Sequence, residues 1–389
     1  MRLSRVAPIL LGIAAFASSC RVQPVGEAEP AALPFAVDSN ARATVADGVV
    51  HRFLYAPGGP WAIHVLEARA DRCWSLAALK SSGGAVGRAT TSDLVRSAGA
   101  RDTIAGAVNA DFFLFTPPGV PVGLLVMDGR VIAGPIAQPA LAADSAGRTH
   151  IARFETRGSL SAGGRRLEVR GWNRDVADGV AFFDGGWGAA TDTASGVIEV
   201  MLAGPGAYRV TAVDTAAAGV AIPVGGAVLK VGRIAHDSLR ATLRALPVGS
   251  SVSVEMTLAP FHPREAVGGR PVIVRAGAVA PRLDTVGRAG FATNRHPRTA
   301  AGITRDGSRI LLVTVDGRQA PYSDGMSLPE LAGLMRALGA HDAVNLDGGG
   351  STAMIVAERG AFRVANRPSD RGGERAVGNA VGLVRRCAP

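Results

Sequence analysis

Residues able to do chemistry are densest near the C-terminus, where an apolar run leads into a carboxylate, three glycines and two hydroxyls. Asn345 and Asp347 alternate with apolar residues, so on a strand both side chains share one face. Glycines permit backbone geometries closed to other residues, and free N–H groups in such a loop line a concavity for an anion. The pattern predicts a buried strand that ends in a binding loop. The loop residues that we assign to substrate binding are Asn345, Gly348, Gly349, Gly350, Ser351 and Thr352.

Three consecutive glycines after a strand also have other interpretations. A tight turn between two strands is the simplest interpretation of three glycines. Gly348, Gly350 and Ala353 also fit a loose G-x-G-x-x-A dinucleotide pattern. However, residues 353–357 and 362–365 predict a β-hairpin rather than the helix that must hold a pyrophosphate. No G-K-[ST] sequence occurs, which excludes a P-loop.

Further polar residues stand where apolar runs end. Asn109 and Asp111 follow one such run, while Arg298 precedes and Asp316 follows a predicted hairpin. Each has a simpler explanation, such as a turn residue or a surface ion pair. Their common placement at strand ends predicts that they converge with Asp347 on one cleft.

The elements that must position these residues predict an α+β fold: a mixed, β-rich sheet domain with a few packed helices and a β-rich inserted region at 120–290. Residues 299–304 and 309–315 flank an Asp-Gly turn and predict a hairpin. Ser327-Leu-Pro-Glu330 predicts a capping box that opens a helix, with Gly339 as its stop. A second, short helix is predicted at 237–246.

Composition narrows the class of protein. The chain has 389 residues, of which 47% are hydrophobic, so it can bury a large core in one elaborate domain or two ordinary ones. Its formal charge of +10 rests on arginine, because Lys80 and Lys230 are the only lysines. The arginines are scattered singly, without the interleaved aromatics of a nucleic-acid groove, so we predict no nucleic-acid partner.

The N-terminus predicts export. Arg2 and Arg5 precede an apolar stretch of about twelve residues, too short to span a bilayer, and small residues then lead to Cys20. This resembles a bacterial lipoprotein signal: residues 1–19 would be removed and Cys20 lipidated as a membrane anchor. An ordinary secretory signal, giving a periplasmic or secreted protein, is the alternative. Residues 20–47 then predict a flexible tether and 48–387 the folded domain.

The remaining cysteines and acids leave two questions open. Cys73 and Cys387 form either one disulfide or two unpaired thiols. No Cys-His spacing or H-E-x-x-H motif predicts zinc, and no cofactor is predicted. Asp111, Asp316 and Asp347 could nevertheless ligate a divalent metal such as calcium as readily as do acid–base work.

Several motifs together resemble one family. In order and spacing, the chain is similar to the phosphodiester glycosidase family over about residues 50–386, and Asn-Leu-Asp-Gly-Gly-Gly-Ser-Thr is the most specific stretch. Ala110 and Asp111 depart from it, since small residues are more usual there. The segments that carry the resemblance are 109–113, 297–302, 315–318, the helix from Ser327, 345–352 and 375–380.

The resemblance implies a hydrolase that cleaves the sugar–phosphate bond of a glycosyl phosphodiester. Arg298 would hold the phosphate through its planar guanidinium, helped by amides of the Gly348 loop. Asp316 and Asp347 would be the carboxylate pair, with their roles unassigned. Asn109, together with the substrate-binding candidates Asp111, Asn345 and Asn379, would complete the site by orienting sugar hydroxyls or water.

Two rival functions remain. A non-catalytic envelope module that binds anionic cell-surface glycan would keep Arg298 and the glycine loop but need no reactive carboxylate. Alternatively, Ser351 could be the nucleophile of an acyl-transfer enzyme. No complete G-x-S-x-G occurs and no histidine is placed by motif to activate it, which argues against the second rival.

Overall fold

The computed structural model describes residues 33–192, 197–215 and 219–386. The predicted signal peptide, the lipidation site Cys20 and Cys387 lie outside these residues. Four sheets make up the described part, and nearly all neighbouring strands are antiparallel. Three short 3-10 helices accompany them: η1 (Ala70–Arg72), η2 (Leu283–Thr285) and η3 (Gly349–Ser351).

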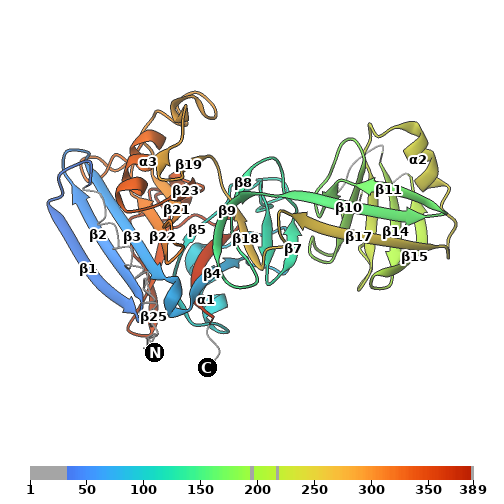
Figure 1. Cartoon of the computed structure of the whole chain (residues 1–389), viewed down its shortest axis with the longest axis horizontal. Helices are drawn as coiled ribbons and strands as arrows, with labels where there is room; N and C mark the ends of the chain where they lie inside the picture. Colours follow the sequence, from blue (N-terminus) through green and yellow to red (C-terminus); the bar gives the residue numbers. More distant parts are fainter. Residues whose placement is uncertain (1–32, 193–196, 216–218, 387–389) are drawn as a thin grey trace, which may run out of the picture. The chain divides into compact units, whose positions relative to one another are not determined.

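Sheet 1 has eight strands and carries most of the strand ends singled out above. Its N-terminal strands, blue in Figure 1, lie beside orange strands from the C-terminal quarter of the chain. Its strands, in spatial order, are β1 (Ser39–Ala46), β2 (Val49–Ala56), β3 (Trp61–Arg69), β22 (Arg309–Val315), β21 (Arg298–Ile303), β23 (Asp342–Asn345), β19 (Val272–Arg275) and β20 (Ala278–Val279).

Sheet 2 packs on sheet 1 through a common apolar core. Leu66 and Leu312 of sheet 1 join Val108 and Met354 of sheet 2 in one fully buried cluster. Helix α1 (Thr91–Gly99) covers sheet 2, and α3 (Leu328–Ala337) covers sheet 1. The strands of sheet 2, in order, are β25 (Ala361–Val364), β24 (Met354–Glu358), β5 (Ile104–Asn109), β26 (Ala380–Arg385) and β4 (Trp74–Leu79).

The middle of the chain builds two further sheets. Sheet 3 contains β7 (Arg130–Ala133), β6 (Leu125–Met127), β18 (Glu265–Gly268), β8 (Pro139–Ala143) and β9 (Thr149–Arg153). Sheet 4 has a separate apolar core and one helix, α2 (Asp237–Arg244). Its strands are β11 (Arg165–Val169), β10 (Glu155–Ala162), β17 (Ser251–Ala259), β15 (Ala207–Asp214), β14 (Ile198–Ala203), β16 (Ala227–Val231), β13 (Val180–Asp184) and β12 (Gly171–Trp172).

The α+β prediction is wrong. The described residues form 26 strands but only three α-helices, none longer than ten residues, so this is a β-rich protein of several sheets. The prediction generalised from one strand–helix–strand segment ending in β23. Elsewhere the short apolar runs bury themselves by packing sheet on sheet, which leaves helices little surface to cover.

Local predictions were more accurate than the global one. The hairpin of β21 and β22, helix α2, and the capping box of Ser327 and Glu330 at the start of α3 are all confirmed. Strand β1 lies inside the range predicted as tether, so the fold begins earlier than predicted. Helix α1 was not predicted.

Two internal connections hold distant segments together. Cys73 is disulfide-bonded, and its carbonyl accepts a hydrogen bond from the Arg386 amide, one residue before Cys387. Lys80 is buried, and its ammonium donates to the carbonyl oxygens of Gly87, Gly119 and Gly378 at 2.6, 2.9 and 2.8 Å. That ammonium therefore joins three loops that lead toward the strand ends.

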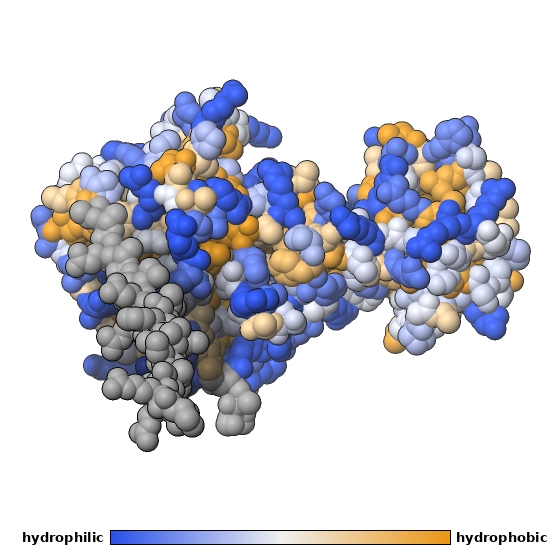
Figure 2. All heavy atoms as spheres, in the orientation of Figure 1, coloured by the Kyte–Doolittle hydropathy of each residue, from blue (hydrophilic) through white to orange (hydrophobic). Residues whose placement is uncertain are grey.

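The surface agrees with the scattered charges of the sequence. On the face shown in Figure 2, hydrophilic residues are interspersed with hydrophobic ones. Within the described residues, no helix has both the length and the apolar character needed to cross a membrane.

We expect Leu312→Ala to lower the free energy of unfolding by about 3 kcal/mol, because it leaves a cavity between sheets 1 and 2. Leu312 is fully buried, whereas Val248 is 69% exposed. Val248→Ala should therefore change stability by less than about 0.5 kcal/mol. Urea denaturation of both variants measures the difference, and equal losses would contradict the packing described.

Candidate active site

Strand ends from sheets 1 and 2 meet at the glycine loop that follows β23. The Asp347 amide donates to the Ala110 carbonyl at 2.8 Å. The Asp111 amide donates to Oδ1 of Asn379, just before β26, at 2.9 Å. The structure thus brings together three segments that are more than 200 residues apart at their extremes.

Asn109 is the hub of this junction and is fully buried. Its Nδ2 donates to the Asp347 carbonyl at 2.6 Å, and its Oδ1 accepts from Thr299 Oγ1 at 2.8 Å and from the Ala353 amide at 3.1 Å. These bonds join β5, β21 and both sides of the glycine loop. The Asn109 side chain is therefore engaged with the protein and positions Asp347 through its backbone.

Asp111 and Asp347 are the two acids of this junction, and the charge of Asp347 reaches Asp111. Burial raises the pKa of Asp111 to about 7, and the nearby charge of Asp347 adds to this rise. The hydrogen bond from the Gly123 amide and the charge of Arg174 act in the opposite direction and lower it. Burial also raises the pKa of Asp347 to about 6, although Ser351, the Gly348 amide and the arginines 375 and 270 oppose it. Two neighbouring acids that titrate near neutrality are suited to acid–base work.

Four polar atoms around this pair are buried without a hydrogen-bond partner of good geometry: Asp111 Oδ1, Asn345 Oδ1, Ser351 Oγ and Asn379 Nδ2. All four belong to residues that the sequence assigned to the site. A buried polar atom without a partner costs about 1–3 kcal/mol, so such atoms collect where a ligand or water is to be bound.

The glycine loop leaves fewer free amides than predicted. The amides of Gly348, Gly349 and Ser351 donate to Asp347 Oδ1, the Pro297 carbonyl and the Gly348 carbonyl, respectively. The Thr352 hydroxyl lies 3.5 Å from the Thr299 hydroxyl inside the protein. An anion at this loop would consequently depend on side chains more than on loop amides.

The glycine loop lies close to two arginine side chains, and the left-handed backbone at Gly349 favours glycine. Gly349 has φ +62°, and a Cβ there would lie 3.2 Å from Nη2 of Arg318. A Cβ on Gly350 would overlap Arg375, whose guanidinium forms a two-bond ion pair with Asp370. The loop is therefore flanked by two guanidinium groups, of which that of Arg375 acts on the pKa of Asp347.

Arg298 is buried, and its side chain holds a loop. Nε donates to the Met326 carbonyl at 2.8 Å, and Nη2 donates to the carbonyls of Phe291 and Asn294 at 2.7 and 3.1 Å. Burial lowers the pKa of this guanidinium to about 10. The guanidinium nitrogens that would bind two phosphate oxygens thus largely donate to backbone carbonyls instead.

Asp316 occupies a hydrogen-bond network of its own. Its carboxylate accepts from Asn366 Nδ2 at 2.9 Å, the Arg367 amide at 3.0 Å and the Tyr322 hydroxyl at 3.2 Å. Asp111, rather than Asp316, is the acid that the structure places beside Asp347. Within the described ranges, no three His, Cys, Asp or Glu side chains are grouped as a metal site, so the carboxylates considered for calcium are not assembled as one.

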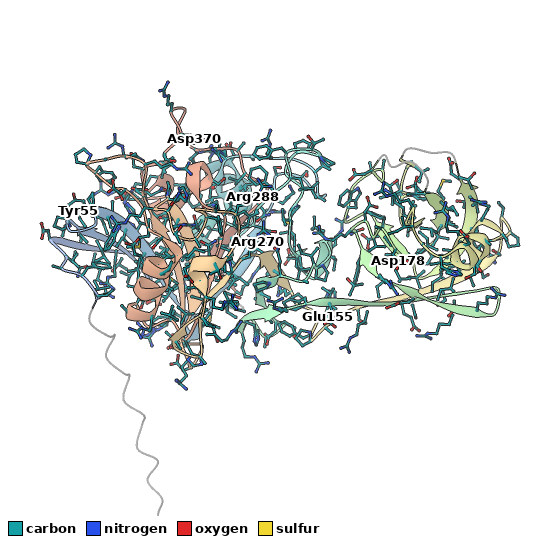
Figure 3. All side chains as sticks on the ribbon, turned by 90° about the horizontal axis from the view of Figure 1, so that it is seen from above. Tyr55, Glu155, Asp178, Arg270, Arg288 and Asp370 are labelled. Carbon is teal, nitrogen blue, oxygen red and sulfur yellow. The ribbon has the colours of Figure 1, made fainter. Side chains whose placement is uncertain are left out.

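Sequence reasoning gave no role to the exposed arginines at the rim. Arg270 lies with its guanidinium 5.0 Å from the Phe112 ring centre, and Arg318 lies 3.4 Å from Nδ1 of His296. Neither forms an ion pair with a carboxylate of the described chain. Arg270 and Asp370 are labelled in Figure 3. Arg318 and Arg375 lay within motifs quoted above, but Arg270 had no local signal.

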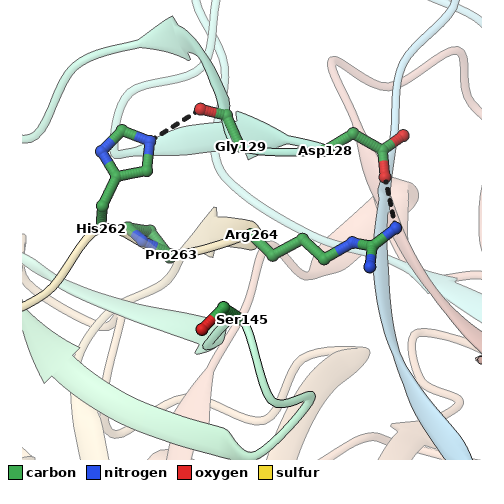
Figure 4. Close-up of a pocket in the computed structure, with 6 residues that line it drawn as sticks. All are labelled: Asp128, Gly129, Ser145, His262, Pro263 and Arg264. Carbon is green, nitrogen blue, oxygen red and sulfur yellow. Dashed lines mark hydrogen bonds and ion pairs between the residues drawn. The ribbon is translucent and has the colours of Figure 1, made fainter.

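One pocket of the described structure lies away from this site. Figure 4 shows it lined by Asp128, Gly129, Ser145, His262, Pro263 and Arg264. His262 Nε2 lies 2.7 Å from the Gly129 carbonyl, and Arg264 pairs with Asp128 at 3.3 Å. Its groups satisfy one another, and the pocket shares no residue with the carboxylate pair.

Solved structures show that the whole fold recurs. A hypothetical protein from Synechocystis aligns with a TM-score of 0.74 at 24% identity, over 90% of this chain and 64% of that chain. This chain therefore spans less than two thirds of that relative. A protein of Burkholderia pseudomallei K96243 aligns with a TM-score of 0.66 at 28% identity, over 84% of this chain and 74% of that one.

Residues 201–384 match the family model described as phosphodiester glycosidase. This segment belongs to that family. The resemblance in the motifs is thereby confirmed, and it supports a hydrolase that acts on phosphodiester-linked sugars. The phosphodiester glycosidase match includes Asp347 and the glycine loop but not Asn109 or Asp111, which the fold brings in from outside it.

The catalytic domain of zebrafish N-acetylglucosamine-1-phosphodiester alpha-N-acetylglucosaminidase aligns at 15% identity with a TM-score of 0.45, over 90% of this chain and 82% of that chain. A search of curated proteins found no match.

We expect Asp111→Asn to stabilise the protein at pH 8 but not at pH 4. The folded-state pKa of about 7 exceeds the unfolded value near 4, so the ionisation penalty is absent below pH 4, grows as pH rises and is complete above pH 7. The neutral amide removes this penalty, and a gain of about 1–3 kcal/mol is expected at pH 8. Thermal unfolding at both pH values measures it, and a loss of stability at pH 8 would contradict a strained carboxylate.

Proposed function

We propose that this protein is a hydrolase that cleaves the sugar–phosphate bond of a glycosyl phosphodiester. The observation that carries the proposal is a pair of acids, Asp111 and Asp347, whose pKa values are both raised toward neutrality beside a loop flanked by arginines. The family match at residues 201–384 supports the same reaction class.

Charge distribution supports an anionic substrate. Arg270 and Arg318 are exposed at the rim and are not neutralised by carboxylates of the described residues. A phosphodiester placed between them would gain the charge-assisted hydrogen bonds that guanidinium groups make with phosphate. In this proposal the rim arginines take the phosphate-binding role that the family resemblance implied for Arg298.

The carboxylate pair would act on the glycosidic carbon. The pKa values of both carboxyls are raised toward neutrality, so we assign the protonated role to the more buried Asp111 and the ionised role to Asp347. Asp347 would stabilise positive charge on the sugar ring or activate water, while Asp111 would donate toward the departing phosphate. A phosphate monoester leaves readily, so a weak acid suffices.

The remaining predicted residues divide into two groups. Asn345 and Asn379 each keep an unpaired polar atom and would hydrogen-bond sugar hydroxyls or the attacking water, and the Ser351 hydroxyl, which lies against Asp347, would join them. Asn109, Arg298 and Asp316 would act as supports, because their side chains already bond to the protein.

The cellular setting is also part of the proposal. The basic, apolar and small-residue pattern ending at Cys20 favours a lipid-anchored protein of the bacterial envelope, where anionic glycans carry phosphodiesters. Radiolabelled palmitate should label the full-length chain in a bacterial host but not the Cys20→Ser variant. Equal labelling of both would exclude Cys20 as the anchor.

Isotope labelling tests the reaction itself. Residues 33–389 are incubated with UDP-N-acetylglucosamine and simple glycosyl phosphodiesters in H₂¹⁸O. We expect the label at C1 of the released sugar, since attack at carbon leaves the phosphate oxygens unlabelled. Label in phosphate would indicate a phosphodiesterase. Binding of anionic glycan without any release of sugar would favour the non-catalytic module instead.

Two substitutions separate chemistry from binding. Asp347→Asn should lower kcat by roughly 10²–10⁴-fold, the usual contribution of a general acid or base. Arg318→Gln should chiefly raise KM, and more so at low ionic strength, because an exposed charge is screened by salt. Arg336→Gln, at an exposed position on α3, serves as the matched control. A wild-type kcat in Asp347→Asn would remove that residue from the mechanism.

A further inference from the structure

Arg174 lies in the loop between β12 and β13 of sheet 4, yet its guanidinium contacts segments that lead to the active site. Nε donates to the Gly134 carbonyl at 2.7 Å, and Nη2 donates to the carbonyls of Gly123 and Pro121 at 2.8 and 3.2 Å. Among the described carboxylates, none lies within ion-pair distance of this guanidinium. Its three hydrogen bonds thus go to the turn at residues 121–123 and to the end of β7.

The turn that Arg174 holds is the one that seats Asp111. The Gly123 amide donates to Asp111 Oδ2 at 2.6 Å. The same carboxylate oxygen would lie 3.1 Å from a Cβ on Gly123 and 2.5 Å from a Cβ on Gly268, so Asp111 is enclosed between two glycines. Arg174 therefore holds the Gly123 side of this enclosure, because it bonds to the carbonyl of the residue whose amide bonds to Asp111.

The neighbouring residues anchor Arg174 itself. Asn173 is fully buried with φ +47°, and its Nδ2 donates to the Val131 carbonyl at 2.7 Å. A Cβ on Gly134 would overlap the Trp172 carbonyl at 2.2 Å, which shows how closely the two segments approach. Residues 172–174 thus form a rigid connection from sheet 4 to β7 of sheet 3.

We propose that Arg174 is a positioning residue for the carboxylate pair, and that sheet 4 supports the active site through it. This inference deepens the proposed function and rests on it for the catalytic role of Asp111. Both residues lie outside the segment that matches the family, so the support comes from the part of the chain that the family match does not reach.

Electrostatics provide a second line of support. The groups that face Asp111 are the amides of Gly123 and Phe112, the Arg174 guanidinium and the Asp347 carboxylate. Asp347 in turn faces Arg375 and Arg270. Arg174 lowers the pKa of Asp111, and Asp111 in turn opposes the lowering that burial imposes on the pKa of Arg174. The two side chains are therefore coupled in both directions.

The test measures Asp111 directly. Infrared difference spectra report the protonated carboxyl band of Asp111, assigned by its loss in Asp111→Asn, across a pH titration. In Arg174→Gln we expect the band to persist to higher pH by about one unit, because an opposing cation has been removed. Arg174→Lys keeps the charge and should shift the band less. Arg170→Gln, which removes two exposed ion pairs near the same loop, should not shift it.

Kinetics on a glycosyl phosphodiester complete the test. Arg174→Gln and Arg174→Lys should both lower kcat by roughly ten- to a hundredfold with little change in KM, since the seat of Asp111 loosens while the rim arginines remain. A purely structural Arg174 would lower the melting temperature without moving the Asp111 titration, and that result would overturn the proposal. If Arg174→Gln does not fold, an unchanged kcat in Arg174→Lys would overturn it equally.

The infrared readout needs no substrate. If the wild type hydrolyses no phosphodiester but the Asp111 band still shifts in Arg174→Gln, the proposed function fails while the positioning role of Arg174 stands. If hydrolysis is seen and the band does not shift, the proposed function stands while the positioning role of Arg174 fails.

Discussion

The burial of Asp111 within the electrostatic influence of the half-buried Asp347 is the constraint on which the rest of the site depends. An ionised acid in a protein interior is costly unless donors or cations lie close by. Asp111 and Asp347 receive amide donors from Gly123 and Gly348 and the field of several arginines, but their pKa values remain raised. Both acids are thus brought toward the pH range in which acid–base chemistry works.

Around this pair the protein uses buried cations that are capped by carbonyl oxygens rather than by carboxylates. Lys80, Arg174 and Arg298 each donate to three backbone carbonyls. Carbonyl dipoles satisfy the N–H groups but leave the net positive charge in place. These cations therefore hold loops together, and Arg174 also favours the ionised form of Asp111.

Several features of the site were predictable because they depend on neighbours in sequence. The capping box of Ser327 and Glu330, the hairpin of β21 and β22, and the alternation of Asn345 with Asp347 all follow from spacing. The glycine loop was recognised from composition, and its family match confirms the resemblance. The fold class was not predictable in the same way, because whether an apolar run packs against a helix or another sheet is decided by residues distant in sequence.

The sequence by itself determined the order of strand ends, the glycine loop and the inventory of polar groups at them. Only the tertiary structure decided which of these groups meet. Asp316 and Arg298 looked equivalent to Asp111 in sequence, but their side chains are used up by Asn366, Arg367, Met326 and Phe291. A side chain can bind substrate only with the hydrogen-bond donors and acceptors that have no protein partner after folding. Which of them have a partner depends on contacts between distant segments, and the spacing of residues along the chain does not determine those contacts.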